Sequence, residues 1–149
     1  MMKIPFPLPP VLAHLHERLE RYTEHREYGF FLAEQDRNNQ AQGQPVLIYI
    51  TEKQLTSTDT SPARRPPAFM GEVLAPEGQS DRLERCAKAG VFEFWRVRTS
   101  EDVEVRIYLQ PSESGYGEER VFRGDERVQS AVFDELELTP RELLQPPPE

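Results

Sequence analysis

The stretch PAFMGEVLAPEGQSDRLERCAKAGVFEFWRV, residues 67–97, decides the fold because it predicts a strand, a helix and a second strand in succession. Residues 68–75 carry apolar side chains on both faces, and Pro76 follows them. A strand that is apolar on both faces is typical of the middle of a sheet. We therefore expect residues 68–75 to form a central strand.

A short helix is expected next, over about residues 81–89. Ser80 and Asp81 supply polar groups at its start, and Gly90 marks its end. Residues 92–98 are again apolar on both faces, which predicts a second buried strand. Sixteen residues separate Ala75 from Phe92, enough for a crossover, so the two strands are expected to be parallel neighbours.

Glu72 is the exceptional residue of the first strand, because it is an acidic side chain among apolar ones. An ionised carboxylate in such a strand costs several kcal/mol unless a cation, a metal ion or hydrogen-bond donors meet it. An ion pair with Arg82, Arg96 or Arg98 is one reading, and a metal ligand in a hydrolytic site is the other. Charge pairing alone favours the ion pair.

Composition restricts the class of protein. The 149 residues fit one domain, and the net charge of −8 disfavours binding to nucleic-acid phosphates. Cys86 is the only cysteine, which excludes an intrachain disulfide and fits a reducing compartment. We expect a cytoplasmic protein without a membrane span, since no apolar run reaches about 18 residues.

The remaining elements follow from periodicity and turn residues. Apolar residues at helical spacing predict a helix from Val11 to about Glu24. Before the central strand we expect an extended arm over 1–8, a hairpin of strands 28–34 and 45–50, a helical turn over 51–55 and a mobile loop over 56–67. After the crossover we expect a strand over 103–109 and a hairpin over 120–129 that turns at Gly124–Asp125. The chain should close with a helix opened by the capping box of Thr139 and Glu142, followed by a tail over 145–149.

Several motifs together carry a resemblance to a known family. They are PVLIYI, PAFMGEVLAP, the helix ending KAGV, FEFWRV and SAVFDELELTPRELL. From about Pro9 to Leu144 the chain resembles the Uma-type family of putative restriction endonucleases, within the PD-(D/E)XK nuclease superfamily. The resemblance implies one α/β (α+β) domain over 1–149, with a restriction-endonuclease-like mixed sheet, a central β-α-β crossover, flanking helices and a C-terminal meander. The family usually has a hairpin ahead of its first long helix, and from the sequence we do not expect one here, so the resemblance implies a shortened, divergent member.

The same resemblance assigns candidate site residues. In the family, carboxylates hold magnesium and a lysine assists the water that attacks a phosphodiester. The metal-binding acids match Val46 and Ala68, the family glutamate matches Glu72, and the lysine falls near Arg82. Arginine stays protonated at neutral pH and is a poor base. The resemblance thus implies catalytic positions at Glu72 and Arg82, with Glu72 as the remaining metal ligand.

Three functions stay open at this point. The first is a catalytically impaired nuclease fold that acts as a binding or assembly module, with Glu72 and Arg82 kept as an ion pair. The second is a magnesium-dependent DNA endonuclease in which Glu34, Glu77 or Asp81 replaces a lost acid. The third is a structural subunit that pairs with a copy of itself or with a relative. Magnesium is the expected cofactor only if the chain is active.

Overall fold

The computed structural model describes residues 8–24, 29–35, 45–51, 67–74, 80–99 and 102–145. These residues form a mixed α/β structure with two helices, one 3-10 turn and a six-stranded sheet. The elements are α1 (Pro10–Thr23), β1 (Gly29–Gln35), β2 (Pro45–Thr51), β3 (Phe69–Leu74), α3 (Arg82–Ala89), β4 (Glu93–Thr99), β5 (Val103–Leu109), β6 (Glu118–Arg123) and η2 (Pro140–Leu144).

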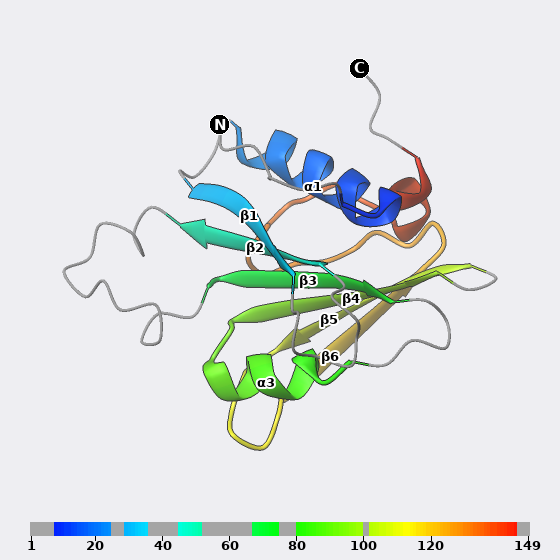
Figure 1. The fold of residues 1–149 in the computed structure, drawn as a ribbon. Coiled ribbons are helices and arrows are strands. Elements are labelled where there is room, and N and C mark those ends of the chain that lie inside the picture. Colours follow the sequence, from blue (N-terminus) through cyan, green and yellow to red (C-terminus); the bar gives the residue numbers. More distant parts are fainter. Residues whose placement is uncertain are drawn as a thin grey trace.

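The strands lie in the order of the sequence, from β1 to β6, as Figure 1 shows. Only β3 and β4 are parallel, and every other neighbouring pair is antiparallel. The predicted parallel crossover, the first helix and the β1–β2 hairpin are confirmed. The expected arm over 1–8, the helical turn over 51–55, the loop over 56–67 and the tail over 145–149 lie almost entirely outside the described residues.

The crossover helix α3 begins and ends as its sequence predicts. Ser80 Oγ accepts the backbone N–H of Arg82 over 3.1 Å, which satisfies one free donor of the first turn. Gly90 follows the helix with φ of 85°, a left-handed conformation that glycine adopts without a steric penalty. The helix therefore stops in time for β4 to begin at Glu93.

The two faces of the sheet are covered differently. One face packs against α1 and the segment that follows β6, which Figure 1 shows on the same side of the sheet. The other face carries α3 and a smaller apolar cluster that includes Met70, Cys86, Phe94 and Tyr108. Residues alternate between these faces along each strand, so neighbours in sequence serve different layers.

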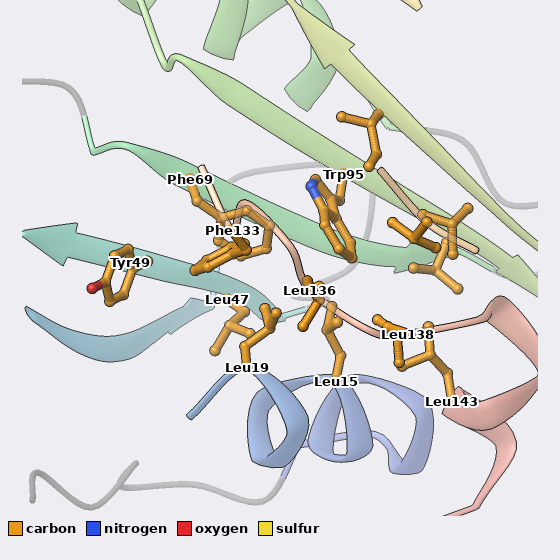
Figure 2. Close-up of a cluster of buried hydrophobic side chains, with 14 of the residues drawn as sticks. Leu15, Leu19, Leu47, Tyr49, Phe69, Trp95, Phe133, Leu136, Leu138 and Leu143 are labelled. Carbon is orange, nitrogen blue, oxygen red and sulfur yellow. The ribbon is translucent and has the colours of Figure 1, made fainter. Parts of the chain in front are cut away.

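Aromatic rings form the centre of the larger core, shown in Figure 2. The ring of Phe133 lies 5.2 Å from that of Phe69, 5.4 Å from that of Tyr49 and 6.3 Å from that of Trp95. Trp95 is fully buried, as its place in the crossover predicts. Phe133 comes from the segment after β6, so this late part of the chain completes the core.

The predicted hairpin over residues 120–129 is wrong in its second half. The turn at Gly124–Asp125 forms, with the N–H of Glu126 donating to Arg123 O over 3.0 Å. Residues 126–130, however, do not continue as a strand beside β6. Val128 is buried in the larger core and donates its N–H to Leu138 O over 2.8 Å. Burial of this segment over the sheet face replaces pairing with β6.

The closing helix forms as one 3-10 segment, η2. Its capping box is present, with the N–H of Thr139 donating to Glu142 Oε1 over 2.8 Å. His14 of α1 donates from Nδ1 to Leu143 O over 2.7 Å, because a carbonyl oxygen can only accept. This bond joins the first and last elements on one side of the sheet.

Candidate functional site

The candidate site is centred on Glu72, the fourth residue of β3. Its side chain is fully buried, on the sheet face that also carries Met70 and α3. Glu72 is buried because β3 lies between β2 and β4, and both faces of the sheet are covered at this strand. A carboxylate in this position is stable only with partners that offset its lost hydration.

Two arginines provide those partners. Arg96 donates from Nε to Glu72 Oε2 over 2.8 Å, and Arg82 Nη1 lies 3.5 Å from Oε1. Arg96 is directly opposite Glu72 in the parallel register of β3 and β4, whereas Arg82 is the first residue of α3. The expected proximity of Glu72 and Arg82 is therefore confirmed. A catalytic role for this pair stays a prediction.

Burial makes this ion-pair cluster a part of the core. The side chain of Arg82 is 3% exposed and that of Arg96 is 11% exposed. The guanidinium of Arg96 also lies 5.9 Å from the ring centroid of Phe94, within range of a cation–π contact. Its Nη2 atom is buried and has no acceptor among the described residues. The cluster is thus a largely buried arrangement of charges.

The two positions that the resemblance assigns to metal-binding acids, Val46 and Ala68, lie in different places. Val46 and Glu72 are the next residues of β2 and β3 beyond the Leu47–Gly71 pair, on the same face of the sheet. Ala68 instead precedes β3, four residues before Glu72, a separation of roughly 13 Å along a strand. An acid at position 46 would approach Glu72, and an acid at position 68 would not.

The three alternative acids also differ in position. Glu34 is opposite Val46 in the β1–β2 register, which places it two strands from Glu72 and leaves it exposed. Asp81 forms an exposed ion pair with Arg85 over 3.0 Å. Glu77 lies outside the described residues. Of the two alternative acids that the structure describes, Glu34 is therefore the one that lies in line with Glu72 across neighbouring strands.

Cys86 borders the site from the helix side. Its Sγ lies 3.6 Å from Met70 Sδ, and its side chain is 5% exposed. Burial raises the pKa of the Cys86 thiol to about 12, and the nearby charge of Glu72 adds to the increase. The thiol therefore stays protonated at neutral pH and is not a nucleophile.

The donor set does not fit magnesium. Magnesium prefers several oxygen ligands in octahedral geometry. Here both oxygens of Glu72 face guanidinium groups, and the neighbouring position 46 carries a valine. Within the described parts of the chain, no group of three or more His, Cys, Asp or Glu side chains is placed to hold a metal ion. The site resembles a charge-paired core more closely than a metal centre.

A second buried carboxylate, Glu93, escaped the sequence analysis. It is fully buried on the opposite face and accepts four hydrogen bonds. Trp95 Nε1 donates over 2.6 Å and Ser130 Oγ over 2.5 Å to one oxygen, while the backbone N–H groups of Ala131 and Val132 donate over 2.8 and 3.1 Å to the other. An acid in an apolar strand was the available signal, as it was for Glu72. The donors from residues 130–132 could not be anticipated because they are distant in sequence.

The fold and the site together define a mixed α/β protein with a charge-paired carboxylate at a parallel crossover. Residues 11–141 match the Uma2 family, described as putative restriction endonucleases. The chain belongs to this family. No curated protein and no solved structure matches it significantly. Among the described residues, no helix is long and apolar enough to cross a membrane.

Proposed function

We propose that this chain is a catalytically impaired member of the Uma2 family that keeps a restriction-endonuclease-like fold and acts as a binding or assembly module. The observation that carries the proposal is the pairing of Glu72 with both Arg96 and Arg82. A magnesium ion at this carboxylate would have to displace arginine contacts and approach two fixed positive charges. Its entry is therefore electrostatically unfavourable.

The rest of the donor set supports the same conclusion. Val46 supplies no oxygen beside Glu72, and a side chain at position 68 is too far away along the strand. The position that resembles the family's lysine carries Arg82, and arginine is a poor general base for activating water. The residues that remain are well suited to stabilise the fold, which leaves binding or assembly as the activity of the protein.

Magnesium titration with a cleavage assay tests the proposal. We expect the parent protein to show no magnesium-dependent rise in melting temperature at millimolar metal and no cleavage of double-stranded DNA. The Glu72→Gln variant serves as the matched control in both assays. Metal-dependent cleavage by the parent that disappears in Glu72→Gln would overturn the proposal and favour an active endonuclease. If Glu34→Gln also abolished this cleavage, Glu34 would be identified as the replacement acid.

A further inference from the structure

The outer edge of β6, on the side away from β5, has no neighbouring strand among the described residues. The N–H of Gly124 donates towards β5, to Val103 O over 3.3 Å, whereas the N–H of Arg123 points away and donates to Glu126 Oε1 over 2.7 Å. Because this orientation alternates along a strand, Glu119 and Val121 also direct their N–H and C=O groups outward.

The chain that follows β6 does not fill this edge. Arg120 is opposite Ile107 and therefore lies on the face of the larger core. It donates from Nη1 to Gln129 O over 3.1 Å, and Ser130 then reaches Glu93 on the same face. The segment after the turn thus passes over a face of the sheet and not alongside β6 in its plane.

We propose that two copies of this chain associate through their β6 edges in antiparallel orientation, with Val121 opposite Val121 of the second copy. In this register Glu119 lies opposite Arg123 of the second copy, and Arg120 lies opposite Phe122. On both sides of the central valine pair, each of these cross-strand pairs then joins opposite charges or an arginine and an aromatic ring, both of which are stabilising. The two-fold axis repeats every pair, so the edge is complementary to itself.

Charges within each chain extend this complementarity. Arg106 Nη1 lies 3.3 Å from Glu119 Oε2, and Arg123 Nε lies 2.9 Å from Glu104 Oε2. Across the proposed interface, the row therefore runs from Arg106 to Glu119, and then to Arg123 and Glu104 of the second copy. Charged side chains can protect an edge strand because pairing with a second strand would bury them or place like charges opposite each other. Here no like charges meet.

The proposed interface is small, which determines how it must be measured. Glu126 already holds the N–H of Arg123, so the backbone ladder is limited to the middle of β6. An interface made by one short strand from each copy lies at the weak end of specific association, so we expect monomer and dimer to exchange reversibly. The measurement should therefore extend to about 200 µM protein. Sedimentation equilibrium then gives a mass that rises from 17.3 kDa towards twice this value. A parent that stays at 17.3 kDa overturns the proposal.

Charge reversal tests the register. We expect Glu119→Arg and Arg123→Glu each to raise the dimer dissociation constant about tenfold, because each places like charges opposite each other twice. We expect the variant with both reversals to regain the parent's dissociation constant. This variant also loses the ion pairs of residues 119 and 123 with Arg106 and Glu104 within the chain, so loss of those pairs alone cannot explain weaker association of the single variants. Glu113→Arg, in the exposed β5–β6 loop, is the matched control and leaves the constant unchanged. A doubly reversed variant as weak as the single ones overturns the register.

A disulfide trap gives an independent test. Residues opposite each other in an antiparallel pair have Cα atoms about 5.5 Å apart, within the range of a disulfide. We expect Val121→Cys to form a covalent dimer under mild oxidation. Glu119→Cys should not, since two copies of residue 119 lie roughly 13 Å apart along the strands. The parent, with only buried Cys86, controls for other cross-links. Equal trapping at positions 119 and 121 contradicts the proposed register.

Discussion

Arg96 holds Glu72 more closely than Arg82 does, at 2.8 Å against 3.5 Å. The closer partner comes from the neighbouring parallel strand, where the two residues are directly opposite each other. The position of this ion pair is therefore set by the β3–β4 ladder itself. Arg82 adds a second positive charge from the helix that connects the two strands.

Removal of the carboxylate should destabilise the protein. Glu72→Gln leaves two buried guanidinium groups poorly compensated, and we expect a loss of about 3–5 kcal/mol in the free energy of unfolding. Urea denaturation measures this loss. Glu84→Gln, on the exposed side of α3, is the control and should change stability by no more than about 0.5 kcal/mol. A loss below about 1 kcal/mol for Glu72→Gln would show that the arginines do not depend on it.

Restoration of an acid should create metal affinity at one position and not at the other. Val46→Asp with Arg82→Lys places a second carboxylate beside Glu72 and removes one permanently charged guanidinium. We expect magnesium to raise the melting temperature of this variant, with a dissociation constant on the order of millimolar. Ala68→Asp with Arg82→Lys is the matched control and should not respond. A response from the control alone would place the metal site elsewhere.

Truncation of Trp95 should test the centre of the larger core. Trp95→Ala removes a fully buried ring and the indole donor of Glu93, and we expect a cost of about 3–5 kcal/mol by chemical denaturation. Phe92→Ala provides the comparison, because Phe92 is 50% exposed and lies just before the same strand. The Phe92 variant should lose less than about 1 kcal/mol. Equal losses would contradict the assignment of Trp95 to the core.

Glu104 should make stability depend on pH. Its partial burial alone would raise its pKa, but hydrogen bonds and charge from Arg106 and Arg123 outweigh this and lower the pKa below its ordinary value. A lowered folded-state pKa stabilises the protein above the unfolded value of about 4.3, and this contribution is lost as pH falls through the folded-state pKa. Glu104→Gln should thus cost about 1 kcal/mol or less at pH 7 and nothing at the acid end of a series of denaturation curves. A constant difference at every pH would exclude the ion pairs as its cause.

The sequence predicted the crossover because its signals are local. Apolar side chains on both faces of residues 68–75 require a central strand, and Gly90 ends the helix at the correct point. The same local logic identified Glu72 as a carboxylate in need of a partner. It left Arg82, Arg96 and Arg98 as alternatives, since only the register of β3 and β4 places Arg96 opposite Glu72.

The errors arose where distant parts of the chain meet. The residues after Gly124 have the spacing of a hairpin, but Val128 and Phe133 are buried in the core instead of lying beside β6. The importance of Glu93 was missed for the same reason. Three of its four donors lie 37 to 39 residues later in the chain. Local periodicity contains no information about such contacts.

The four-donor arrangement around Glu93 also ties the middle of the sheet to a late part of the chain. A chain truncated before Ser130 would keep the residues of all six strands, but its β4 would bury a carboxylate with only the indole of Trp95 as donor. Such a chain would bury a polar group without most of its hydrogen-bond donors, which is unfavourable. We therefore expect the packing of β4 to depend on Ser130, Ala131 and Val132, which lie far from it in the sequence.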